Sequence, residues 1–328
     1  GVAMQDNGSN EKLVAAIRDA DAQATRALLS NGADANAKDD DGLTALMYAA
    51  MYAGADCVKL LLERGADPNA RSKSGASALM LAVGQADKVR LLLAKGAEVN
   101  AKSKQGHTAL TIAAARAGTA EVVKSLLDHG ADLTDANVLG AAARSGDIQV
   151  VKLLLDRGAD PNNGNKVGGP APVSAKRADE LIKIREMLLM SPIIAIPENI
   201  GGTTLMYAAY VGNIEVIKLL IEKGADVNAR NNHNGTALML VAQRGDLVSV
   251  KLLLEKGADP RVRHASGYTA LMYAAASESS DPELIKVFLA KGVELNVKAN
   301  DGETALKLAG RKGRTEIVRL LEKAGAKE

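Results

Sequence analysis

The chain has 328 residues, of which 47% are hydrophobic and 24% charged, the composition of a globular protein. Its 41 basic and 39 acidic residues give a formal charge of +2, which creates no overall field that would attract nucleic acid or an anionic membrane. The single cysteine, Cys57, excludes an internal disulfide and a multi-cysteine zinc site, and no apolar run approaches the length of a membrane span. We therefore expect no nucleic-acid partner and no insertion into a membrane.

A helix-ending phrase returns along the chain, first as LLSNGADANA and last as LLEKAGA. Its glycine stands at positions 32, 65, 96, 130, 158, 224, 257, 292 and 325. Neighbouring glycines lie 28 to 35 residues apart, except that the step from Gly158 to Gly224 is 66, or two periods of 33. The period predicts ten repeats, near residues 9–38, 39–71, 72–102, 103–134, 135–166, 167–199, 200–230, 231–263, 264–298 and 299–328.

The residues within each repeat predict two helices. A turn with glycine precedes Thr or Ser and then a short alanine-rich helix, as at 44–50, where the threonine is placed to cap the helix. A second turn leads to a longer helix with apolar residues at helical spacing, as at 214–223, and the next glycine supplies the left-handed residue that ends it. A helix pair of this size cannot bury its apolar side alone, so the repeats must stack on one another.

The turns repeat the motifs DGLTAL, SGASAL, QGHTAL, SGYTAL and DGETAL. With the period of 33, they resemble the ankyrin repeat over residues 9–328. The resemblance implies an all-α fold: a single ankyrin-repeat solenoid over 1–328, built of stacked helix-turn-helix units with projecting β-hairpin or loop connections and a concave binding face. Met replaces the family's His in five repeats, and we expect a ladder of methionines packed between repeats, at 47, 80, 206, 239 and 272.

Two places depart from the regular period. The connection after Gly130 is five residues shorter than usual, so its hairpin should be missing or stunted. The degenerate repeat 167–199 is rich in proline and divides the chain into two half-arrays. Within it, Ile193, Ile194 and Ile196 either seal the junction between the half-arrays or form a docking patch.

The sequence carries no catalytic signature. It contains no GxSxG, no HExxH, no phosphate-binding loop and no dinucleotide fingerprint. Cys57 falls in the apolar register of a second helix, and the four histidines occur singly rather than at metal-ligand spacing. We therefore expect no enzymatic activity, no cofactor and no metal site.

The tyrosines point to a binding face. All six fall in a first helix or in the turn before it, the side that lines the concave face in the family. Tyr48, Tyr207 and Tyr273 share one register, where a packing role is at least as good an explanation as a contact with a partner. The remaining three occupy positions that vary among ankyrin proteins and usually face the partner, so we assign binding to Tyr52, Tyr210 and Tyr268. Equivalent positions elsewhere add Leu43, Met51, His107, Arg116, Arg144, Gln243 and Arg244.

These observations predict a scaffold for protein–protein interaction. The array would hold a protein or peptide partner on its concave face and would itself be a monomer. The alternative is a structural or regulatory ankyrin appendage of a larger multidomain protein.

Overall fold

The computed structural model describes residues 7–134, 136–163, 202–279 and 281–327. These residues form eighteen helices, with no strand among them and two isolated β-bridges, Lys38 with Thr44 and Arg263 with Thr269. The chain divides into two compact units. Of the described residues, the first unit holds those up to 138 and the second holds those from 139 onward. No helix in the described ranges is long and apolar enough to cross a membrane.

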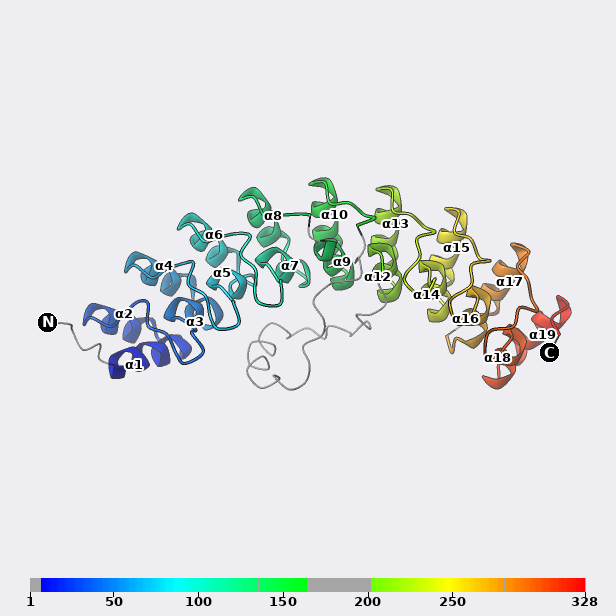
Figure 1. Cartoon of the computed structure of the whole chain (residues 1–328), viewed down its shortest axis with the longest axis horizontal. Helices are drawn as coiled ribbons and strands as arrows, with labels where there is room; N and C mark the ends of the chain where they lie inside the picture. Colours follow the sequence, from blue (N-terminus) through cyan, green and yellow to red (C-terminus); the bar gives the residue numbers. More distant parts are fainter. Residues whose placement is uncertain (1–6, 135, 164–201, 280, 328) are drawn as a thin grey trace. The chain divides into compact units, whose positions relative to one another are not determined.

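Each of the nine repeats that the structure describes contributes a first and a second helix, and in each unit the two kinds form separate rows (Figure 1). The first helices are α1 (Asn7–Arg18), α3 (Ala45–Tyr52), α5 (Ala78–Leu81), α7 (Ala109–Ala114), α9 (Ala136–Ser145), α12 (Thr204–Val211), α14 (Ala237–Arg244), α16 (Ala270–Ala276) and α18 (Ala305–Arg311). The second helices are α2 (Ala22–Ser30), α4 (Ala55–Glu63), α6 (Ala86–Ala94), α8 (Ala120–Asp128), α10 (Ile148–Asp156), α13 (Ile214–Glu222), α15 (Leu247–Glu255), α17 (Pro282–Ala290) and α19 (Thr315–Lys323).

The predicted helix ends are confirmed. Seven first helices begin after a Thr or Ser whose hydroxyl accepts a backbone N–H of the first turn, as Thr44 does from Met47 at 3.2 Å. The glycine of the recurring phrase has positive φ in all nine of its positions, for example 85° at Gly65. Because a side chain disfavours this conformation, glycine is the residue that ends the second helices here.

The core lies between stacked repeats, as the amphipathic pattern requires. The five methionines that replace the family's His are all buried, with exposures of 0 to 4%, so the predicted methionine ladder is confirmed: Met47, Met80, Met206, Met239 and Met272. Phe288 of α17 is fully buried in the same layer as the leucines of the other second helices. Packing of first helices on first helices and of second helices on second helices propagates this core along each unit.

A repeated asparagine joins each connection to the next. The Asn36 amide donates to the carbonyl of Gly65 at 3.0 Å, and the Asp67 backbone N–H donates to the Asn36 amide oxygen at 2.8 Å. The same pair of bonds recurs at Asn69, Asn100, Asn162, Asn228 and Asn296. Thr134 and Arg261 occupy the equivalent position in two repeats. Neither side chain has an amide that can both donate and accept these hydrogen bonds. The ladder therefore fixes the spacing of most neighbouring connections.

Replacing Asn228 by alanine should lower the free energy of unfolding by about 1–2 kcal/mol, because two exposed backbone-directed hydrogen bonds are lost. Urea denaturation followed by circular dichroism measures this change. Asn232 is an exposed residue of the same connection between α13 and α14, and its replacement by alanine is the control, with an expected effect within about 0.5 kcal/mol. Equal stability of the two variants would show that the ladder does not stabilise the array.

Repeats 135–166 and 200–230 contact one another directly. The amide of Asn162 donates to the Gly224 carbonyl at 2.9 Å, and Lys223 pairs with Asp156 at 2.8 Å. These contacts place the two described repeats directly against one another. The expected repeat 167–199, with Ile193, Ile194 and Ile196, lies outside the described residues.

The connection after Gly130 is short, as expected. It runs from the end of α8 at Asp128 to the start of α9 at Ala136, whereas the connection from α2 to α3 runs from Ser30 to Ala45.

Candidate binding face

The first-helix face of each unit is formed by its first helices and by the turns that precede them. It carries every residue that the sequence assigns to binding, and none of these ten is buried. Tyr52 is the most exposed of their aromatic side chains at 45%, and His107, Gln243 and Arg244 are also exposed. The partly exposed ones are Leu43, Met51, Arg116, Arg144, Tyr210 and Tyr268.

A groove of about 660 Å³ opens on this face in the second unit. It brings together three of the assigned residues, Gln243 and Arg244 at the end of α14 and Tyr268 before α16. Tyr273 of α16 and Leu308 of α18 add apolar surface. Side chains from three successive repeats therefore converge on one hollow.

The hollow arises from small side chains in the middle repeat. The seventh and eighth residues after the capping threonine are Gln243 and Arg244 at the end of α14, and Arg311 and Lys312 at and directly after the end of α18. At the same two places the repeat of α16 has Ala276 and Ser277. Short side chains between two rows of long ones leave a space that no neighbouring residue fills.

A smaller groove of about 200 Å³ has the same origin in the first unit. Its lining includes two assigned residues, Met51 of α3 and Arg116 after α7. Gly84 stands between them, seven residues after the capping Ser77, so the middle repeat contributes no side chain at that one position. The assigned residues Leu43, Tyr52, His107, Arg144 and Tyr210 lie outside both grooves.

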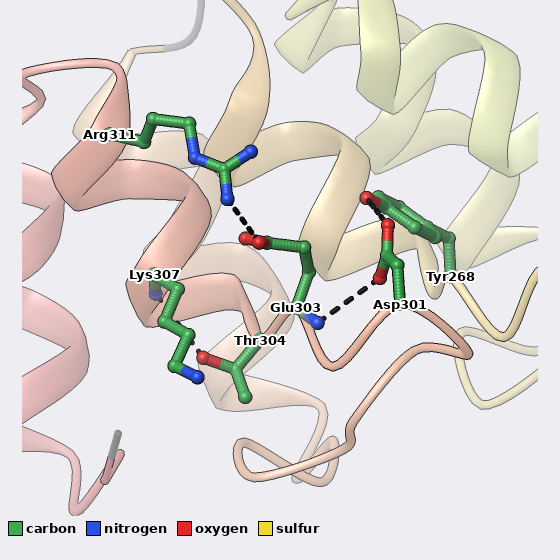
Figure 2. A network of polar contacts seen from close by, with 6 residues as sticks. All are labelled: Tyr268, Asp301, Glu303, Thr304, Lys307 and Arg311. Atoms are coloured by element: carbon green, nitrogen blue, oxygen red, sulfur yellow. Dashed lines mark hydrogen bonds and ion pairs between the residues drawn. The ribbon is translucent and has the colours of Figure 1, made fainter.

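Tyr268 is held in place by an acidic residue of the next repeat (Figure 2). Its hydroxyl donates to the Asp301 carboxylate at 2.9 Å, and the same carboxylate accepts the Glu303 backbone N–H at 3.1 Å. Burial and the bond to Asp301 raise the pKa of Tyr268, and the Glu303 N–H and the tyrosine lower the pKa of Asp301. Glu303 in turn pairs with Arg311. These contacts hold the Tyr268 ring in one orientation.

A family model described as ankyrin repeats (3 copies) matches residues 13–103, 85–165, 179–264, 205–298 and 238–327. This chain belongs to the ankyrin repeat family. A stretch of 61 residues is 43% identical to the "Probable E3 ubiquitin-protein ligase XBOS33" of Oryza sativa subsp. japonica, which is 18% of this chain and 12% of that protein. Ankyrin repeats are generally modules of protein–protein interaction and typically lack catalytic function.

All three tyrosines that share one register in this ankyrin array have contacts within the chain; the Tyr273 ring lies 6.3 Å from the His264 ring and 5.5 Å from the Tyr268 ring, measured between ring centres. The Tyr48 hydroxyl donates to Asp39 at 2.5 Å, and burial together with this bond raises the pKa of Tyr48. Tyr207 is buried, and the Arg144 guanidinium lies 4.7 Å from its ring centre. Tyr273 differs because it also lines the larger groove.

Sequence reasoning missed Lys88, a fully buried residue of α6. Its ammonium donates to the carbonyls of Ala49 at 3.2 Å and Ala50 at 3.0 Å, near the C-terminal end of α3. Burial lowers the pKa of Lys88, and it also raises the pKa of the nearby Cys57 thiol. The available signal was a lysine at the core position where α4 has Cys57. The residue belongs to the core of the first unit and not to the first-helix face.

The Cys57 thiol should react slowly with an aromatic disulfide reagent in the native ankyrin array and rapidly in denaturant. Burial restricts access, since only 6% of the residue is exposed, and it also disfavours the thiolate. A Val248→Cys variant provides the reference, because Val248 is 64% exposed. We expect one fast and one slow thiol in that variant, and two fast thiols would contradict the packing around Cys57.

Proposed function

We infer that this ankyrin array is an interaction scaffold that binds a protein or peptide through its first-helix face. The observation that carries the proposal is the convergence of assigned residues on two grooves, one within each unit. Tyrosine and arginine are the residue types that dominate binding energy at protein interfaces, and here they are accessible on one kind of face. The orientation of Tyr268 by Asp301 reduces the entropy that a partner must remove.

A peptide-display selection against the full chain tests the proposal. Selected peptides should bind the wild type and lose affinity for a variant in which Tyr52, Tyr210 and Tyr268 are all replaced by alanine. A matched variant carries alanine at three exposed positions in or directly after second helices, Lys59, Val248 and Lys256, and should bind like the wild type. Binding that survives the tyrosine replacements and falls in the matched variant would assign the interface to the second helices instead.

The proposal includes no catalysis, no cofactor and no nucleic-acid partner. The described residues contain no group of three or more potential metal ligands. Weak, salt-insensitive retention on mixed DNA and RNA is the expected result, and strong binding that disappears with salt would contradict it. Sedimentation at several concentrations should give the mass of a monomer.

The alternative role is an ankyrin appendage of a longer protein. The match to XBOS33 favours it, because the similar stretch is only 12% of that protein. An antibody against this array should then detect a natural product much larger than 34.0 kDa. A product of that mass itself would contradict the appendage role.

A further inference from the structure

The groove on α14, α16 and α18, together with the end of α9 two repeats away, carries a pattern of positive charge. We propose that this surface binds an extended acidic peptide segment that also inserts an apolar side chain. This assignment rests on the function inferred above and specifies the chemistry of its partner. Three observations carry it: the position of the cations, the way in which they are fixed, and the apolar surface between them.

The cations recur in alternate repeats. Arg144 lies in the last turn of α9, Arg244 in the last turn of α14, and Lys312 directly follows α18. The last turns of α12 and α16, which stand between them, contain no basic residue. A cation at a helix C-terminus is favourable for the helix itself, but that effect does not require alternation. With neighbouring helices about 8–10 Å apart, cations two repeats apart are separated by about 16–20 Å.

Two of these cations are held by contacts that leave donors for a ligand. The Arg244 guanidinium donates one N–H to the carbonyl of Tyr210 at 2.9 Å, and a guanidinium has five such donors. Gly212 permits this position, since a Cβ there would lie 2.5 Å from a guanidinium nitrogen. The Arg144 guanidinium lies over the face of the Tyr207 ring. In this position the N–H groups at the edge of the guanidinium can donate to a ligand. A carboxylate matches the fork geometry of both groups.

The third cation, Lys312, forms an ion pair within the chain, and its partner is exposed to solvent. Lys312 pairs with Glu278 at 3.4 Å, and the glutamate side chain is 85% exposed. An exposed pair of this kind contributes little to stability, so a ligand carboxylate can exchange for Glu278 at small cost. Arg311 does not join the row, because it pairs with the more buried Glu303.

The surface between the cations favours a peptide over a nucleic acid. Tyr268, Tyr273, Ala276 and Leu308 line the groove between Arg244 and Lys312 and match an aromatic or branched aliphatic side chain. Regularly spaced phosphates would meet a cation only in every second repeat. An extended peptide rises about 3.3 Å per residue, so carboxylates about five or six residues apart would reach neighbouring cations. The preferred ligand therefore has spaced Asp or Glu residues with an apolar residue between them.

The test uses a random peptide library displayed against the full chain, followed by fluorescence anisotropy with the selected peptides. We expect enrichment of Asp and Glu at a spacing of about five or six residues around an apolar residue. The double variant Arg244→Glu and Lys312→Glu should weaken binding about tenfold or more, and added salt should weaken wild-type binding. The matched control, Lys251→Glu and Lys256→Glu, has the same net charge on the second helix α15 and its end and should bind like the wild type.

The outcomes separate this inference from the scaffold function. Selected peptides that are neutral or basic, or acidic peptides that lose the same affinity in both charge variants, would overturn the acidic-ligand assignment. If the affinity of the selected peptides still falls when Tyr52, Tyr210 and Tyr268 are replaced, the scaffold function stands without the acidic-ligand assignment. Tight binding of single-stranded RNA that depends on Arg244 and Lys312 would assign the groove to phosphates instead. Circular dichroism melts of each variant identify losses of binding that come from unfolding.

Discussion

Replacing Lys88 by glutamate should lower the free energy of unfolding by about 3–5 kcal/mol, the cost of an uncompensated buried charge. The lysine ammonium now satisfies the carbonyls of Ala49 and Ala50, and a carboxylate at the same place would face two oxygens and the negative end of the α3 dipole. Burial leaves the new side chain no access to water. Urea denaturation followed by circular dichroism measures the change.

Lys88→Met is the control for this substitution. Methionine retains a flexible apolar stem, removes the desolvation of an ammonium and loses two hydrogen bonds, so the net change should stay within about 1.5 kcal/mol. A glutamate variant as stable as the methionine variant would show that the Lys88 side chain leaves the core in solution.

Lys88 should also make the free energy of unfolding depend on pH. Because burial lowers its pKa, the unfolded chain binds more protons than the folded chain between the folded and the ordinary lysine pKa. Stability of the wild type relative to Lys88→Met should therefore rise with pH through that window. A difference that stays constant or falls between neutral pH and pH of about 10 would contradict a lowered pKa.

Replacing Phe288 by alanine should cost about 3–5 kcal/mol, because it removes a fully buried ring and leaves a cavity between repeats. The corresponding core position holds Leu61 in α4 and Leu220 in α13. Phe288→Leu therefore restores the side chain that the other repeats use, and it should cost only about 1 kcal/mol. Thermal and urea denaturation compare the two variants. Equal losses for alanine and leucine would show that the site depends on the aromatic ring rather than on filled volume.

The repetitive part of the fold was predictable from the sequence because each local signal agreed with its neighbours. The capping threonines, the glycines that end the second helices and the buried methionines all follow from position within the period. The stacking of repeats 135–166 and 200–230 was not, since a step of 66 residues states how much chain intervenes and not whether it stacks. The asparagine ladder was missed because its signal, the fifth residue of GADxN, has the composition of an ordinary turn.

The site was predictable only in part. Periodicity identified the face that carries Tyr52, Tyr210 and Tyr268, but the grooves depend on what neighbouring repeats lack. Ala276, Ser277 and Gly84 carry no signal of their own in the sequence. They open the grooves because the adjacent repeats have longer side chains at the same positions. Lys88 was missed because a lysine in an apolar register is compatible with a solvated side chain until its carbonyl partners are known.

The bond between Asn162 and Gly224 has a consequence for folding. It joins residues 62 apart in sequence, whereas the equivalent bonds of Asn36, Asn69 and Asn228 close 27 to 31 residues. Doubling the length of a closed loop costs about 0.6 kcal/mol of chain entropy. In a linear array whose stability is a sum of nearest-neighbour terms, this interface thus starts with an entropic disadvantage. Partial unfolding of the second unit should begin there, and native-state hydrogen exchange would detect it as earlier exchange in α10 and α13 than in α15.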